Sequence, residues 1–185
     1  MANNKVLFGF SDLYIGTYEV GAGGTVTLGT PYHQAGAVGF SPEMSDDRND
    51  FWADNIAYYS NFSDAPIEGD LEVAMFDDAF KTQFLGYRAL TDGGLALVKG
   101  ATKPNVYIAF EIQGDQEARR VIFYNGTLGN ISRSYATIEE TAEPQTATLP
   151  TSFAGDNATG VKMAVYKPGD DGYATLFTAP SAPAF

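Results

Sequence analysis

The alternation of apolar and polar positions between residues 67 and 75 predicts a β-strand. Side chains on a strand point alternately to opposite faces, so one face is apolar and the other carries carboxylates. The apolar positions are Ile67, Leu71, Val73 and Met75, and the acidic positions are Glu68, Asp70 and Glu72. Two such charges about 7 Å apart repel by about 0.6 kcal/mol in water and by far more in a dry interior. We therefore expect the acidic face to be wet, as any solvated sheet face is.

A helical period replaces this alternation immediately after the predicted strand. Phenylalanines recur at every fourth position, at Phe76, Phe80 and Phe84. Asp77 or Asp78 can cap the N-terminus, and Gly86 can adopt the left-handed conformation that ends a helix. We therefore predict a short helix, from about Asp77 to Leu85, that packs its three phenylalanines on a sheet.

The remaining apolar runs predict further strands, separated by glycine-rich and proline-rich turns. The predicted strands cover residues 6–10, 13–20, 34–45, 106–113, 118–125, 128–138, 145–154 and 160–166, with turns at 21–24, 91–94 and 169–172. In the hairpin formed by 106–113 and 118–125, Glu111 falls opposite Arg120, and Tyr107 falls opposite Tyr124. Both are favourable cross-strand pairs.

Residues 45–64 have no clear period and combine aspartates with large aromatic side chains. The aromatic residues are Phe51, Trp52, Tyr58, Tyr59 and Phe62. We predict an irregular loop, and three interpretations remain open. It can be a protein interface anchored by aromatic residues, or an ordinary solvated loop packed on its own domain. A Ca²⁺ site is the third, although the aspartates lack the DxDxDG spacing and the bidentate glutamate of such sites.

Length and composition fit one mainly β domain. The chain has 185 residues, including 13 phenylalanines, 11 tyrosines and 20 glycines. A net charge of −12 argues against a nucleic-acid-binding surface, which needs clustered lysine and arginine. The chain has no cysteine, which excludes disulfides and thiolate chemistry. We see neither a signal peptide nor an apolar run of about 18 residues, so we expect folding in a cytoplasm.

Enzymatic motifs are difficult to find in this sequence. His33 is the one histidine and has no triad or zinc-site pattern around it, which favours a surface or interface position. Paired carboxylates could in principle hydrolyse glycosides. The candidates are Glu68, Asp70, Glu72, Glu139 and Glu140, but short turns leave little chain to build a cleft around them. We expect no enzymatic activity, cofactor or metal.

Three segments give the sequence a family resemblance. They are EGDLEVAMFDDAFKTQFLG at 68–86, RRVIFYNGT at 119–127 and EETAEPQTATL at 139–149. Their order and spacing resemble the major tail protein family of long, non-contractile bacteriophage tails. The resemblance implies a single tail-tube domain, a β-sandwich or half-barrel with one helix on its flank. It also implies a structural virion protein that is made in the host bacterial cytoplasm and assembles there into stacked hexameric rings.

The same resemblance assigns roles to the two features singled out above. Tube proteins of this kind line their lumen with negative charge, so Glu68, Asp70 and Glu72 become candidate lumen-facing carboxylates. A long loop typically reaches a neighbouring subunit, which makes the aromatic residues of 45–64 candidate inter-subunit contacts. The implied partners are other copies of the chain, the tape measure protein, tail initiator and terminator proteins, and double-stranded DNA that passes through the lumen without specific binding.

Two other functions remain compatible with the residues. One is a β-sandwich binding module for carbohydrate or protein, with tyrosines and Trp52 as platforms. The other is a small hydrolase that uses the carboxylates. The last residues, 178–185, read TAPSAPAF and are predicted to be flexible.

Overall fold

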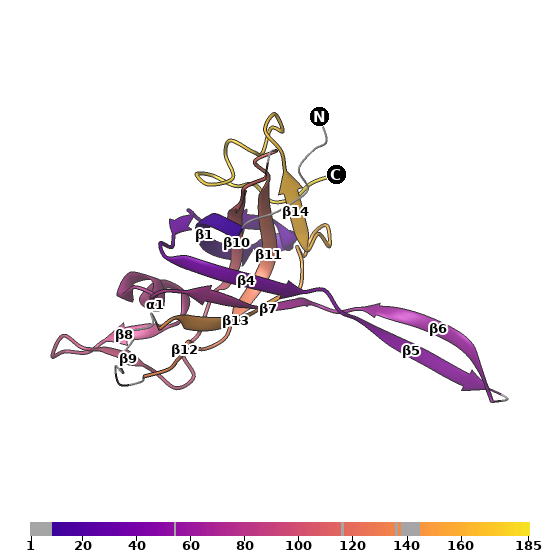
Figure 1. The fold of residues 1–185 in the computed structure, drawn as a ribbon, viewed down its shortest axis with the longest axis horizontal. Coiled ribbons are helices and arrows are strands. Elements are labelled where there is room, and N and C mark those ends of the chain that lie inside the picture. The colour runs from indigo at the N-terminus through magenta and orange to yellow at the C-terminus, as the bar shows by residue number, and fades with distance from the viewer. Residues whose placement is uncertain (1–8, 54, 116, 136, 138–144) are drawn as a thin grey trace.

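The computed structural model describes residues 9–53, 55–115, 117–135, 137 and 145–185, without the side chains of 46–49, 51–53 and 57–63. Most of this chain forms one ten-stranded sheet (Figure 1). Its strands are β1 (Gly9–Val20), β2 (Val26–Leu28), β3 (Tyr32–His33), β4 (Ala37–Glu43), β7 (Ile67–Val73), β10 (Asn105–Gln113), β11 (Arg120–Leu128), β12 (Ser132–Arg133), β13 (Ala147–Phe153) and β14 (Met163–Tyr166). Two hairpins, β5 (Asp46–Ala53) with β6 (Ile56–Asp64) and β8 (Tyr87–Ala89) with β9 (Leu95–Leu97), and two helical segments, α1 (Asp78–Phe84) and the 3₁₀ turn η1 (Ala22–Gly24), complete the described elements.

The sheet runs in the order β2-β1-β10-β11-β13-β7-β4, with β3 beside β1, β14 beside β11 and β12 beside β13. Although β1 and β4 are not neighbours in this order, they lie in contact, so the sheet curls into a half-barrel. Phenylalanines fill its inside: the ring of Phe40 lies 5.4 Å from Phe123, 5.9 Å from Phe110 and 6.2 Å from Phe153. The predicted mainly β fold with one short helix is confirmed.

The main core is the set of buried side chains on this inner face and under α1. It comprises Leu13, Ile15, Ile67, Leu71, Val73, Phe76, Phe80, Phe84, Leu85, Val106, Ile108, Phe110, Val121, Phe123, Leu128, Ala147, Leu149 and Phe153. On β10 the members Val106, Ile108 and Phe110 are two residues apart, because alternate side chains share a face. The main core therefore joins strands that are far apart in the sequence.

Helix α1 begins directly after β7 and adds its phenylalanines to the main core. The Asp77 carboxylate caps it by accepting a 2.7 Å hydrogen bond from the backbone N–H of Phe80, and Gly86 follows its end at φ 71°. The rings of Phe76 and Phe84 lie 4.9 Å and 5.1 Å from that of Phe80. Met75 was predicted on the buried face but is 60% exposed, because β7 ends at Val73.

A second cluster, the outer core, lies on the opposite face of β1, β10 and β11. Its buried members are Tyr18, Tyr107, Ala109, Ile122, Tyr124 and Leu176. Residues 167–177 cover this face, and β14 extends the sheet beside β11. The guanidinium of Arg120 lies between the rings of Tyr173 and Phe177, 4.1 Å and 4.2 Å from their centroids. The C-terminal segment thus buries part of the sheet's outer face.

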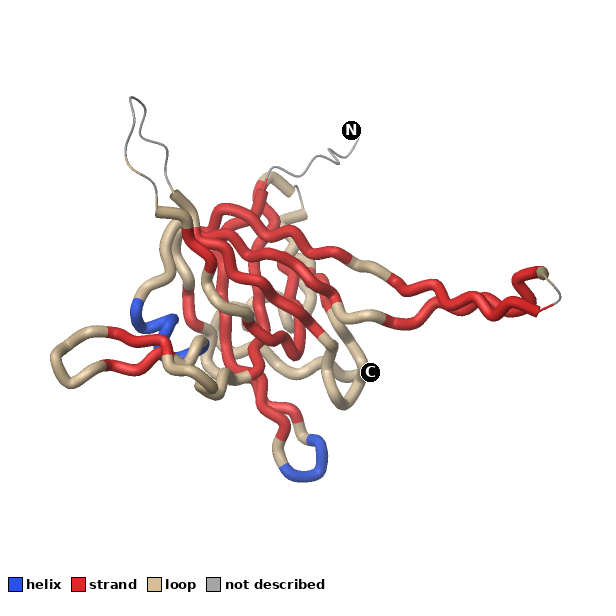
Figure 2. Tube along the Cα trace, turned by 90° about the horizontal axis from the view of Figure 1, so that it is seen from below, coloured by secondary structure: helices blue, strands red, loops and turns tan. Residues whose placement is uncertain are grey.

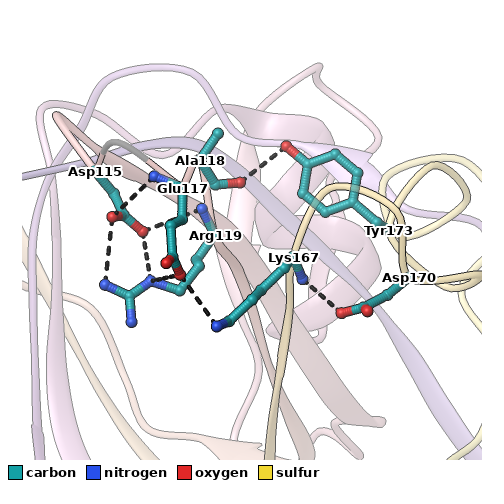
Figure 3. A network of polar contacts seen from close by, with 7 residues as sticks. All are labelled: Asp115, Glu117, Ala118, Arg119, Lys167, Asp170 and Tyr173. Carbon is teal, nitrogen blue, oxygen red and sulfur yellow. Dashed lines mark hydrogen bonds and ion pairs between the residues drawn. The ribbon is translucent and has the colours of Figure 1, made fainter. Parts of the chain in front are cut away.

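Polar contacts fix the C-terminal segment to the β10–β11 hairpin (Figure 3). The Lys167 ammonium lies 3.1 Å from the Glu117 carboxylate, and the Tyr173 hydroxyl donates to the Ala118 carbonyl at 2.9 Å. Within the turn, Asp115 accepts a 2.5 Å hydrogen bond from Nε of Arg119. The hydrogen bond from Arg119 lowers the pKa of Asp115 to about 2, outweighing the opposing effect of burial.

The β10–β11 hairpin confirms one predicted pair and corrects the other. Glu111 lies opposite Arg120, with a 3.0 Å ion pair between them. Tyr107 is not paired with Tyr124, because the register shifts between Val106 and Ile108. On β11, Asn125 takes a φ of 53°, which accommodates the extra residue of a bulge.

Three other predictions differ from the structure. Residues 45–64 form the paired strands β5 and β6 in place of an irregular loop, with Asn55 at φ 60° in the turn. Residues 9–20 are one strand, because a bulge with Asp12 at φ 54° lets β1 continue where two strands were predicted. Of the strand predicted at 128–138, the described part contains the short β12. The predicted TDGG hairpin is confirmed as β8–β9.

The last residues, 178–185, have no strand or helix in the structure, and Pro183, Ala184 and Phe185 lie beside β14. Their flexibility stays a prediction.

The loop at 155–160 is tied to the outer core by Asp156, which is 2% exposed. Its carboxylate accepts hydrogen bonds from the Tyr18 hydroxyl at 2.9 Å and from the hydroxyl and N–H of Thr159 at 2.7 and 2.8 Å.

This arrangement predicts an acid-sensitive contribution to stability. Burial acts to raise the pKa of Asp156, but the hydrogen bonds from Thr159, Tyr18 and Ala158 outweigh it, so the pKa is lowered. A lowered pKa stabilises the fold above the unfolded-state value of about 3.9, and the contribution disappears as pH falls towards the folded-state value. An Asp156→Asn variant should lose about 1–3 kcal/mol of unfolding free energy at pH 7 and show a flatter decline below pH 5.

Denaturant unfolding from pH 7 to pH 3 measures this difference. An Asp171→Asn variant, changed at an exposed position, serves as the control and should follow the wild type. Parallel stability curves for the wild type and the Asp156→Asn variant would show that the contribution of Asp156 does not titrate.

Candidate functional site

The acidic strand predicted from the sequence is β7, which lies between β13 and β4. It pairs with β13 along its whole length, from Ile67 opposite Phe153 to Val73 opposite Ala147. Leu71 and Val73 are fully buried in the main core. This pairing fixes which side of β7 faces outward.

The carboxylates of β7 occupy that outward side. Glu68 and Asp70 are exposed, and Glu72 is half-buried and accepts a hydrogen bond from the Thr146 hydroxyl. The alternation predicted for this strand is therefore present in the structure. Together with the outward side chains of β4 and β13, these residues form the carboxylate face, defined by Glu43, Glu68, Asp70 and Glu72.

Glu43 on β4 is the member that the sequence analysis missed. It lies directly opposite Glu68, whereas Asp70 lies opposite Ser41. Two carboxylates at adjacent positions about 5 Å apart repel by about 0.8 kcal/mol in water, so this pair is tolerated only where water screens it. Alternation on the predicted strand places Glu43 on the same face as Ser41. It does not place Glu43 beside Glu68, because β4 and β7 are distant in the sequence.

A shallow hollow of about 530 Å³ opens on this face. Three carboxylates line it, from Glu43, Glu68 and Asp70, and the other lining residues are Ser41, Gly69, Thr127, Leu128, Gly129, Pro150, Thr151 and Ser152. Lysine and arginine are absent from this lining set. The lining of the hollow is therefore negative, and a negative surface repels polyanions. The Lys103 ammonium lies at its margin, where it donates to the carbonyls of Leu128 and Gly129 at 3.1 and 2.5 Å.

Gly69 brings β4 and β7 close together at the centre of the carboxylate face. A Cβ atom at this position would lie 2.6 Å from the Ser41 carbonyl oxygen and 2.9 Å from Cα of Pro42. Both are backbone atoms of the neighbouring strand, which cannot move aside as a flexible side chain can. A glycine is therefore required for this pairing.

The second predicted feature, the aromatic segment, extends away from the sheet. Strands β5 and β6, here called the β5–β6 arm, pair from Asp46 opposite Asp64 to Ala53 opposite Ile56 and project beyond the half-barrel (Figures 1 and 2). The side chains of Phe51, Trp52, Tyr58, Tyr59 and Phe62 lie outside the described residues. The arm and the carboxylate face are distinct surfaces.

The remaining candidates do not join this face. His33 is exposed, with its ring 5.0 Å from that of Tyr14 on the neighbouring β1. Glu139 and Glu140 lie outside the described residues. Among the described residues, no group of three or more histidine, cysteine, aspartate or glutamate side chains is arranged to hold a metal ion.

Comparisons with known proteins give a family match and solved structures of similar fold. The family model described as "Phage tail tube protein" matches residues 1–160. A search of curated proteins found no match. The solved structure of the anti-feeding prophage cap, described as a tube terminating cap, has a TM-score of 0.50 at 8% identity over 90% of this chain and 99% of that chain. The 6-fold symmetrised anti-feeding prophage baseplate has a TM-score of 0.49 at 10% identity, covering 90% and 97%.

A search of the described residues for membrane-spanning helices found no helix of sufficient length and apolarity.

The geometry predicts that the carboxylates of β7 do not hold the fold together. A Glu68→Gln/Asp70→Asn/Glu72→Gln variant should keep its unfolding free energy within about 1 kcal/mol of wild type, because it removes mutual repulsion at a wet face. Leu71→Ala, on the inward side of the same strand, is the matched control and should cost about 2–5 kcal/mol. Denaturant unfolding at pH 7 checks both, and unfolding of the triple variant would assign the row a structural role.

Proposed function

This chain belongs to the phage tail tube protein family, and we propose that its copies assemble into stacked hexameric rings whose lumen is lined by the carboxylate face. Family membership makes the chain a structural component of the phage virion tail that assembles with other tail components. The observation that carries the proposal is the exposed carboxylate face on β4, β7 and β13, whose hollow has no lysine or arginine among its lining residues.

The electrostatics of this face suit a channel through which DNA moves. When subunits are arranged in a ring, each carboxylate becomes a ring of carboxylates. A phosphate about 8 Å from one carboxylate is repelled by about 0.5 kcal/mol in water, and many such pairs act together. A wall of this kind does not bind the phosphate backbone, so DNA slides past it. The net charge of −12, which argues against nucleic-acid binding, is thus compatible with DNA transit.

The edge of the sheet supports association within a ring. Strand β4 is the last strand in the order of the described sheet, and it carries Gly39, Ser41 and Glu43 of the outward surface. A free strand edge can pair with another chain, which a ring uses as its assembly contact. Such pairing would extend the carboxylate face from one subunit to the next.

The β5–β6 arm supports contacts beyond the subunit. A strand of eight residues extends for about 27 Å, which is long enough to reach across a neighbouring subunit. The aromatic residues in its sequence are of the types that anchor protein interfaces. We therefore assign the arm to inter-subunit contact. The tape measure protein, the initiator and terminator proteins and DNA in transit complete the proposed set of partners.

Electron microscopy of the purified protein over a concentration series, with sedimentation velocity alongside, tests this proposal. We expect rings or hollow tubes with six-fold symmetry to appear as concentration rises. Assembly should also be promoted by the tail initiator complex, because a preformed ring removes the nucleation step. Monomers at every concentration even with the initiator present, or particles without a central channel, would contradict the proposal.

A further inference from the structure

Strand β14 has one side without a partner strand in the described sheet. It joins the sheet through β11, with Val121 opposite Val165 and Ile122 opposite Ala164, and it pairs with no other described strand. The edge of a sheet presents backbone N–H and C=O groups that can pair with a strand of another chain. The half-barrel therefore has a further edge at β14.

The direction of the backbone groups on β14 follows from its pairing. The Tyr124 N–H donates to the Lys162 carbonyl at 3.0 Å. In an antiparallel ladder, alternate residues direct both backbone groups to the same neighbour, so Ala164 also faces β11. Met163 and Val165 therefore direct their N–H and C=O groups to the open side. The Val165 side chain is 44% exposed, so another chain has access to this residue.

The tail, defined here as residues 180–185, lies along this open side. Pro183, Ala184 and Phe185 line a hollow of about 760 Å³ together with Met163 of β14. Figure 1 shows the end of the chain beside β14, on the side away from β11. The tail therefore occupies the position at which an added strand would lie.

The tail covers the edge without pairing with it. Proline has no backbone N–H, and the tail contains both Pro180 and Pro183. Among the described residues, no backbone hydrogen bond joins the tail to β14. Ala182 and Pro183 are half-buried. Because a covering loop and proline are two of the means by which proteins block a sheet edge, the tail can exclude an added strand without extending the sheet itself.

The residues before the tail hold its start in place. Leu176 is 2% exposed in the outer core, and the ring of Phe177 stacks on that of Tyr14 at 4.6 Å. The Ala179 N–H donates to the Thr175 carbonyl at 2.8 Å, which closes a turn. This turn sets the direction in which the chain leaves the outer core.

We propose that the tail closes the β14 edge to the strands of a second copy, so that subunits meet through β4. The inference rests on the proposed function, because it takes β4 to be the edge that is used within a ring. An open edge on β14 would accept a second copy in competition with β4 and would lead to assemblies without a channel. The tail is thus a self-contact that directs assembly.

A full-length variant with a loosened tail tests this closure. The glycine-tail variant, Pro180→Gly/Ala182→Gly/Pro183→Gly/Phe185→Gly, keeps the length and net charge of the chain but loses the prolines and the apolar contacts. It should fold like the wild type, because residues 175–179 are unchanged. It should self-associate at a concentration at least about tenfold lower than the wild type, into particles without a central channel. Sedimentation velocity and electron microscopy measure both properties, and circular dichroism confirms folding.

Two substitutions at Val165 separate strand pairing from apolar contact. Adding Val165→Pro to the glycine-tail variant removes an N–H that faces the open side and no hydrogen bond to β11, so association should return to the wild-type concentration. Adding Val165→Thr removes apolar surface but keeps the N–H and the branched shape, so association should persist. In the wild-type tail, Val165→Pro should leave the protein folded and monomeric.

The outcomes distinguish the closure from its alternatives. A glycine-tail variant that remains monomeric wherever the wild type does would overturn the proposal. Association that survives Val165→Pro would also overturn it, because apolar contact and not strand pairing would then be the cause. Ordered tubes at lower concentration would overturn it too, since the tail would then restrain the normal contact. A wild type without rings even with the initiator would contradict the proposed function, whereas the variants are compared as free subunits and report on the edge separately.

Discussion

The structure depends on the requirement that β7 keep one face dry and the other wet. Leu71 is fully buried while its neighbour Asp70 is exposed, and both conditions hold in one register with β13 and β4. A slip of one residue would bury carboxylates, at several kcal/mol each, and would expose apolar side chains worth about 2 kcal/mol each. The strand is thus fixed in place by the same alternation that creates the carboxylate face.

The two faces of the half-barrel have different roles in the structure. The inner face and α1 form the main core, and the outer face of β1, β10 and β11 is covered by the C-terminal segment that follows β14. Arg120, held between Tyr173 and Phe177, secures that cover. The outer face of β4, β7 and β13 carries exposed charge in place of such a cover. The position of the C-terminal segment therefore determines which part of the sheet is available to line a channel.

Elements with local periodicity could be predicted from the sequence. The alternation in β7 and the four-residue spacing of Phe76, Phe80 and Phe84 come from neighbouring residues, and the Glu111–Arg120 pair follows from a short hairpin. The bulges at Asp12 and Asn125 could not be predicted, because left-handed backbone at these residues depends on tertiary context. The arm was missed because its polar and aromatic residues do not alternate clearly, and Glu43 because its partner strand is distant in sequence.

The central claim is that the carboxylate face lines a closed channel, and thiol labelling tests it most directly. The chain has no cysteine, so an Asp70→Cys variant carries one thiol on that face. A large polymer-linked maleimide should modify it readily in free subunits and at least about tenfold more slowly in assembled tubes, since a channel wall is shielded from bulky solutes. An Asp171→Cys variant, on the C-terminal segment, reports the effect of assembly elsewhere. Equal labelling of the thiol at position 70 in subunits and tubes would contradict the account.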